Sequence, residues 1–383
     1  MNKGLMRAAG CLVAWLIIGS SPALPCSLCG AQSGNRPTLR QDAALAKLIL
    51  YGQLTNAKIN AASDTGGTTD LHIEKTLRSD PWLGDKKLVE LPRYVQVDAK
   101  SDRYIILCDI FKGKLDPFRG EPAKSAAAVE YVEKVLKLDP RDSTRALPFF
   151  FDYLDHSDAL IAQDAYLEFA KATDAEIGRV ASKLSADKLR KWLLDPQTPA
   201  YRLGLYGFLL GACGGDKDAA LLRSLVEKTS ERTTAALGGL MSGYIRLRRR
   251  EGWDLTESML RDTRRSFTER LAVISTIRFY HGWQPQETRE QVLRCLKILA
   301  CQGEMADMAF EDLRRWELWD LTKDVLEQYG KKTHSAPIVR RALVRYAVAC
   351  PKPEARQFVA EVRRQDPQLV SDVEESLQFE KQK

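Results

Sequence analysis

From about residue 145 to the C-terminus, apolar residues recur at helical spacing in a series of similar segments. Each segment opens on polar residues or a proline and continues with small and apolar side chains. Because each helix in such a pattern has one apolar face to bury, neighbouring helix pairs are expected to stack on one another. The segments start at Asp158, Pro199, Arg232, Thr268, Glu304 and Pro337, so successive starts lie 41, 33, 36, 36 and 33 residues apart, the period of a stacked helix-pair array.

A second set of amphipathic stretches lies between these segments and is expected to supply the first helix of each pair. An irregular all-helical domain is the alternative interpretation. The expected first helices span 145–154, 186–194, 219–228, 254–265, 289–300 and 316–329.

The preceding part of the chain has the pattern of short strands. Between residues 46 and 111, apolar and polar residues come close to alternating, and a turn-rich break falls at 61–69. Pro92 lies inside one of the strand-like stretches and places it at a sheet edge or a bulge. This pattern of short strands predicts a small antiparallel barrel or sandwich.

Turn-forming residues separate the two patterns. Two prolines and a glycine between 117 and 124 indicate the exit from the β region, and Ser125 is expected to cap the following helix. We therefore expect a signal peptide at 1–23, a small β domain at 24–122, a connecting helix within 123–144 and a helical-repeat domain at 145–383. The charged last dozen residues are expected to fray.

The first 23 residues have the pattern of an export signal. Lys3 and Arg7 precede an apolar stretch, and Ser21 and Ala23 are small residues at the −3 and −1 positions of a cleavage site. Twelve apolar residues in a helix cover about 18 Å, too short for a membrane anchor. Cys26 leaves a lipoprotein as an alternative, although Pro25 stands where a small residue is wanted. The mature chain is therefore expected outside the cytoplasm, in a periplasm or the medium.

Charge gives little support to nucleic-acid binding. Cleavage after Ala23 removes two cations and lowers the formal net charge from +7 to +5, and the remaining charges are mostly interleaved. Nucleic-acid-binding proteins usually concentrate basic residues on one face. The strongest basic concentration consists of Arg246, Arg248, Arg249, Arg250, Arg264 and Arg265, which we interpret either as a site for an acidic partner or as a solvated rim.

The helical segments resemble HEAT repeats of the armadillo type. The stretch VRRALVRYAVAC at 339–350 resembles the second helix of such a repeat, and the resemblance covers residues 145 to about 365. It implies a superhelical solenoid whose concave surface binds proteins. The whole chain also resembles a type of exported protein found in planctomycetes.

The sharpest local motif is the CxxC pair Cys26 and Cys29. Such a pair is typical of a redox centre, half of a zinc site or a structural disulfide. Cys108, in the last clear strand, is the partner we expect for one of the two cysteines, because export permits disulfides. Redox activity, a metal site and free thiols remain alternatives.

The β region resembles the netrin-type module of tissue inhibitors of metalloproteinases. The likeness rests on the early cysteines, the stretch LILYGQLTNAKI and a cysteine in a later strand, over residues 26 to 118. It implies an OB-like barrel. Inhibitory members of that family bind zinc through the α-amino group of an N-terminal cysteine, whereas the predicted first residue here is Leu24 and the motif is CxxC instead of CxC.

These observations lead to a functional expectation. We expect an exported, non-enzymatic binding or scaffold protein with a protein partner, no nucleic-acid partner, no cofactor and no membrane span after signal cleavage. The alternative is a protease-inhibitor-like or thiol-redox module that acts through the CxxC segment.

Overall fold

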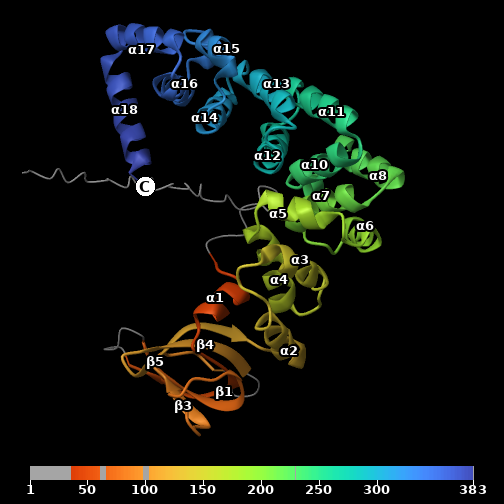
Figure 1. The fold of residues 1–383 in the computed structure, drawn as a ribbon, viewed down its shortest axis with the longest axis vertical. Coiled ribbons are helices and arrows are strands. Elements are labelled where there is room, and N and C mark those ends of the chain that lie inside the picture. The colour runs from red at the N-terminus through yellow and green to blue at the C-terminus, as the bar shows by residue number, and fades with distance from the viewer. Residues whose placement is uncertain (1–35, 61–65, 98–102, 229, 383) are drawn as a thin grey trace, which may run out of the picture.

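The computed structural model has a β-sheet at its N-terminal end and a curved array of helices after it (Figure 1). It describes residues 36–60, 66–97, 103–228 and 230–382. The predicted signal peptide and the CxxC motif lie outside these ranges.

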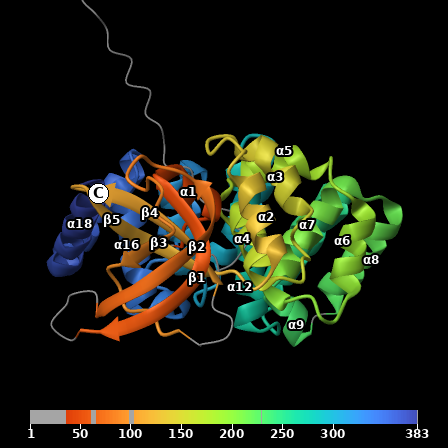
Figure 2. The ribbon, with the colours of Figure 1, turned by 90° about the horizontal axis from the view of Figure 1, so that it is seen from below.

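The β region is one antiparallel sheet in the order β3-β2-β1-β4-β5 (Figure 2). In the central strand β1, Leu50 pairs with Ile106 of β4, and Leu54 pairs with Leu71 of β2. Lys112 and Gly113 have positive φ angles of 48° and 75° and form the two-residue turn between β4 and β5. The strands are β1 (Leu48–Ile59), β2 (Gly67–Arg78), β3 (Leu88–Leu91), β4 (Arg103–Phe111) and β5 (Lys114–Pro122).

The sheet is open, which corrects the expected OB-like barrel. Strands β3 and β5 form its two edges and are not hydrogen-bonded to each other in the described residues. Strand β3 has four residues and ends before Pro92, so it offers too few backbone groups to close a barrel. The segment at 117–124, which we expected as the domain exit, mostly belongs to β5. An edge strand tolerates Pro117 because one of its sides needs no ladder hydrogen bonds.

The two faces of the sheet bury their apolar side chains in different cores. Leu50, Ile106 and Cys108 belong to a cluster within the β region. Ile49 and Leu107, which point to the opposite face, join the large cluster that continues through the helices. The sheet is therefore fixed to the helical array through one of its faces.

The helices match most of the expected segments. The six second helices of the expected pairs correspond to α4, α7, α10, α12, α14 and α16, and the first helices to α3, α6, α8, α11, α13 and α15. Ser125 caps α2 as expected, since its hydroxyl accepts the Ala128 N–H at 3.3 Å. Through the array the bounds are α1 (Leu39–Leu45), α2 (Ala126–Val135), α3 (Ser143–Phe151), α4 (Ala159–Lys171), α5 (Asp174–Ala181), α6 (Ala186–Leu194), α7 (Leu203–Cys213), α8 (Asp216–Glu227), α9 (Glu231–Thr234), α10 (Leu237–Leu247), α11 (Arg249–Arg261), α12 (Phe267–Trp283), α13 (Arg289–Ala300), α14 (Ala306–Arg315), α15 (Thr322–Leu326), α16 (Pro337–Ala349), α17 (Pro353–Gln365) and α18 (Pro367–Lys381).

The end of the chain differs from the expectation of fraying. Residues 367–381 form α18, which starts at Pro367 and is capped by the Asp366 carboxylate. Val370, Val373 and Leu377 are buried in a cluster with residues of α16 and α17. Helix α18 thus covers the apolar face of the last pair.

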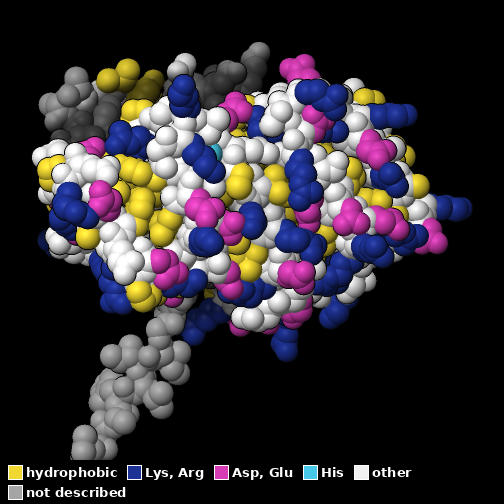
Figure 3. All heavy atoms as spheres, turned by 90° about the horizontal axis from the view of Figure 1, so that it is seen from above, with side chains coloured by type: hydrophobic (Ala, Val, Ile, Leu, Met, Phe, Trp, Pro, Cys, Tyr) yellow, Lys and Arg dark blue, Asp and Glu magenta, His cyan; other side chains and the backbone are white. Residues whose placement is uncertain are grey.

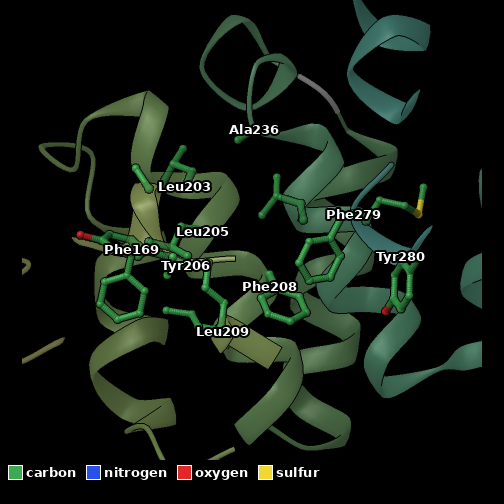
Figure 4. Packing of buried hydrophobic residues seen from close by; sticks show 14 of the residues in the cluster. Phe169, Leu203, Leu205, Tyr206, Phe208, Leu209, Ala236, Phe279 and Tyr280 are labelled. Atoms are coloured by element: carbon green, nitrogen blue, oxygen red, sulfur yellow. The ribbon is translucent and has the colours of Figure 1, made fainter. Parts of the chain in front are cut away.

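The tightest helix contact in the array joins α7 and α10. A Cβ atom added at Gly243 would stand 2.0 Å from the carbonyl oxygen of Gly207, and one added at Gly239 would meet Gly204 almost as closely. Only glycine fits at such an approach, because its backbone carries no side chain. Beside this contact, Phe208 of α7 points toward Phe279 of α12, with ring centroids 4.4 Å apart (Figure 4).

Candidate functional site

The second helices lie on the inner side of the curved array. Figure 1 shows α10, α12, α14 and α16 facing the inside of the arc, while α8, α11, α13 and α15 lie along its outside. Helix α5, which the sequence pattern did not predict, packs against α12, where Gly178 faces the indole of Trp283.

Ion pairs join neighbouring helices of the same row. On the outer row, Arg294 of α13 binds Glu257 of α11 at 2.8 Å. On the inner row, Arg278 of α12 binds Asp312 of α14 at 2.9 Å. Burial raises the pKa of Asp312, although Arg278 opposes the shift. In each pair the arginine is partly exposed and the acid is largely buried, and together the pairs orient each helix on the next.

A buried polar network joins the sheet to the start of the array. The Arg40 guanidinium of α1 donates to Glu168 of α4 at 2.7 Å, and both side chains are buried. From β5, Arg119 donates to Asp42 of α1 at 2.6 Å and to Glu121 at 2.8 Å. These contacts lock α1 between the sheet and α4.

Asp164 is the acid at the centre of this network. One carboxylate oxygen accepts the Leu39 N–H at 2.7 Å, and the other accepts the Tyr131 hydroxyl at 2.8 Å. Burial raises the pKa of Asp164 to about 6, and the Leu39 N–H partly offsets the effect. We did not identify this residue from the sequence. The sequence feature that could have indicated a buried acid here is the spacing of Asp164 and Glu168, which lie one helical turn apart among apolar residues.

A cavity of about 770 Å³, here called the junction cavity, lies beside this network. It opens where β5, α4 and the turn before α7 meet, and Asp164 forms part of its wall. Cavities of this size accommodate drug-sized ligands or short chain segments. Its charged and polar lining comprises Arg36, Arg119, Glu121, Lys124, Ser157, Asp158, Gln163, Asp164, Tyr201 and Arg202.

A second cavity of about 740 Å³, here called the C-terminal cavity, lies near the other end of the array. Its walls come from α14, α16 and α18. Arg314 of α14 contributes to the wall and also binds Glu380 of α18 at 3.0 Å. Trp319, Val348 and Leu377 supply apolar surface. Both cavities therefore combine charges of both signs with apolar side chains.

Of the three cysteines expected to form a disulfide, the structure describes only Cys108. Cys108 lies on β4 with a fully buried side chain that forms no disulfide with another described cysteine, and burial raises the pKa of the Cys108 thiol to about 12. Cys26 and Cys29 lie outside the described residues, so their pairing with Cys108 stays a prediction.

The predicted basic cluster separates into two groups. Arg246, Arg248, Arg249 and Arg250 surround the junction of α10 and α11, whereas Arg264 and Arg265 follow the far end of α11. Thirteen helical residues span about 20 Å, which keeps the groups apart.

Several of these arginines have local partners. Arg246 stacks over Trp283 with its guanidinium carbon 4.4 Å from the ring centroid, and Arg248 binds Asp216 at 2.6 Å. Arg264 binds Asp262 at 2.8 Å, and Arg265 binds Glu269 at 3.3 Å. Figure 3 shows acidic and basic side chains interleaved over the upper face.

Two further features are absent from the described ranges. No cluster of three or more His, Cys, Asp or Glu residues with metal-binding geometry occurs there. Nor does any helix in these ranges have the combined length and apolarity needed to cross a membrane.

Comparisons with protein-family models, curated proteins and solved structures found no match to this chain. The resemblances to HEAT repeats and to the netrin-type module therefore have no independent support.

Proposed function

We propose that this chain is an exported, non-enzymatic binding or scaffold protein, in which a HEAT-like solenoid presents its second helices to a polypeptide partner. The observation that carries the proposal is the placement of the two cavities. The junction cavity is walled by α4, and the C-terminal cavity by α14 and α16, so both involve second helices near opposite ends of the array.

An extended polypeptide suits this placement better than a small molecule does. One small ligand fills one cavity, whereas a chain segment or a folded partner reaches several sites on a curved row of helices. The linings also favour a polypeptide, because side chains of both charges and apolar side chains occur in each cavity. Such mixed surfaces are typical of protein interfaces.

The sheet supports this role by extending the binding surface at one end. Arg119 and Glu121 of β5 line the junction cavity together with residues of α4. Because Arg119 of β5 binds Asp42 of α1 and Arg40 of α1 binds Glu168 of α4, ion pairs join the sheet to the helices through α1. The export signal expected at 1–23 implies a partner in a periplasm or outside the cell.

Two charge-reversal variants with equal charge changes test the proposal. Lys124→Glu with Lys381→Glu alters one exposed lysine of each cavity, and Lys217→Glu with Lys323→Glu alters exposed lysines of the outer helices α8 and α15. Proteins captured from the exported fraction of the native cells are identified by mass spectrometry.

The expected result is a protein captured by the wild type and by the outer variant but lost with the cavity variant. Equal capture by both variants, loss with the outer variant only, or no specific capture by the wild type would contradict the proposal.

A further inference from the structure

The wall of the junction cavity contains a buried cation that has no acidic partner. Arg202, in the turn before α7, lines the cavity and is 8% exposed. Its guanidinium donates to the carbonyl oxygens of Leu154 and Ala162 and to the Tyr201 hydroxyl, and no carboxylate of the described residues lies within ion-pair distance of it. Buried charges are usually paired with an opposite charge. The Arg202 cation is thus held in place by neutral groups only.

Two hydrogen bonds lead from Arg202 to an open donor on Gln163 of α4. Arg202 Nε donates to the Tyr201 hydroxyl at 3.2 Å, and that hydroxyl donates to Gln163 Oε1 at 3.0 Å. A guanidinium can only donate, so the direction of both hydrogen bonds is fixed, and the amide nitrogen of Gln163 remains as a donor. Gln163 Nε2 has no hydrogen-bond partner in the described part of the chain and is not among the buried unpaired polar atoms there, so it is open to solvent. Both Tyr201 and Gln163 line the junction cavity.

Each of the three acids in the cavity wall already accepts hydrogen bonds from the protein itself. Asp158 accepts from the Ser125 hydroxyl at 2.6 Å and from a backbone N–H of α4 at 2.9 Å. Glu121 is bound by Arg119 at 2.8 Å. Asp164 has its two donors in the buried polar network. The acids of the wall are therefore provided with donors and need no ligand.

Lys124 is a second cation of the wall that lacks an acid. It is exposed, and it forms neither an ion pair nor a side-chain hydrogen bond within the described ranges. A neutral carbonyl and a carboxylate are both able to accept from Gln163 Nε2. The positive charges of Lys124 and Arg202 favour the carboxylate, because hydrogen bonds to an ionised acceptor are about twice as strong as neutral ones.

We propose, on the basis of the polypeptide-binding function proposed above, that the junction cavity receives an aspartate or glutamate side chain of the polypeptide partner. Gln163 Nε2 donates to the carboxylate of that side chain, and Lys124 and Arg202 supply the opposite charge. An acidic side chain suits the site better than the carboxylate at a chain end, because the bound polypeptide then continues from the cavity in both directions along the second helices.

Retention of synthetic peptides on the immobilised full mature chain tests this preference. The probes are three libraries of short peptides with neutral residues at the randomised positions. The first library has a fixed central glutamate and blocked ends, the second has glutamine in its place, and the third has the central glutamine and a free C-terminal carboxylate. Retained peptides are quantified by mass spectrometry. We expect the glutamate library to be retained at least fivefold more than either of the others.

The variant Gln163→Glu locates the binding and also gives a readout on the unliganded protein. It keeps the size of the side chain and an acceptor for the Tyr201 hydroxyl, but it replaces the open donor by an acceptor, so the preference for glutamate peptides should be lost. Because the new carboxylate provides the acid that the buried Arg202 lacks, the thermal unfolding temperature should equal or exceed that of the wild type. Gln286→Glu, at an exposed residue in the turn before α13, is the matched control and should keep the preference.

A surface variant covers the case in which Gln163→Glu does not fold. Lys124→Gln removes an exposed cation of the cavity wall and should reduce retention of the glutamate library severalfold. Lys217→Gln makes the same change at an exposed residue of the outer helix α8 and should have no effect.

Four results would overturn the inference. Equal retention of the glutamate and glutamine libraries would show that the cavity does not select an acid, and it would leave the proposed polypeptide-binding function intact. Strongest retention of the library with the free C-terminus would assign the cavity to a chain end. A glutamate preference that persists in both cavity variants would place the acid elsewhere on the protein. Retention of no library would exclude an acid site for short segments, and capture from the native exported fraction would then decide the proposed function separately.

Discussion

The contact between α7 and α10 gives the sharpest stability prediction. Replacing Gly243 by alanine puts a methyl group 2.0 Å from the Gly207 carbonyl oxygen, whereas ordinary contacts begin near 3.4 Å. The obstacle is backbone, so no side chain can rotate away, and the two helices must separate by more than about 1 Å in a close-packed core. Overpacking of this kind costs about 1–3 kcal/mol, and a backbone clash belongs at the upper end.

Helix propensity opposes part of this loss. Alanine is favoured over glycine within a helix by about 1 kcal/mol, which leaves a net destabilisation of about 2 kcal/mol. For a cooperative unit of 150–250 residues this lowers Tm by roughly 4–8 °C.

Circular dichroism at increasing temperature measures the effect. Gly215→Ala is the control, because a Cβ atom added there meets nothing within 4 Å. A Gly243→Ala variant that melts with the wild type, or no lower than the Gly215→Ala control, would refute the close approach of these helices.

The remaining predictions concern the junction network and the cysteines. Because the pKa of Asp164 is raised to about 6 in the folded chain, this group favours folding below about pH 4, and the contribution is lost as the pH rises through 6. The unfolding free energy of Asp164→Asn minus that of the wild type, measured with urea, should therefore be about 2–3 kcal/mol larger at pH 7.5 than at pH 4. A difference that does not change with pH would contradict the raised pKa of Asp164. Arg40→Ala should cost about 3–5 kcal/mol because it leaves the buried Glu168 carboxylate without its partner, whereas Arg36→Ala, at a half-exposed arginine, should cost under about 1 kcal/mol. Peptide mapping without reductant should show Cys108 joined to Cys26 or Cys29; a Cys108 thiol that is alkylated after unfolding without any reductant would contradict that link.

The sequence predicted the helical array well because its boundaries carry strong local signals. Pro337 starts α16 and Ser125 caps α2 through backbone effects that act within one turn. The short helix α5 was missed because it has eight residues and contains Gly178, and its stability comes from packing on Trp283 of α12. That contact joins positions about 100 residues apart, beyond the reach of local periodicity.

The sheet and the sites were harder to predict because they depend on distant pairing. Strand β5 contains Pro117 and Gly120, which locally indicate a turn, and only its pairing with β4 makes it a strand. The basic cluster looked continuous in the sequence, but the length of α11 separates its two groups. The junction cavity combines Arg119, Asp164 and Arg202, residues from three separate elements, so no single stretch of sequence contains its signal.

Site-directed photo-crosslinking tests most directly whether the second helices meet a polypeptide partner. A photoreactive amino acid is placed at Leu160 in the junction cavity or at Arg315 in the C-terminal cavity, and at Arg223 or Lys323 on the outer helices. Crosslinking is carried out in the native exported fraction. We predict that one protein becomes attached at Leu160 and at Arg315 and is absent from the two outer positions. Attachment at the outer positions alone, or no attached protein at either cavity, would contradict the account.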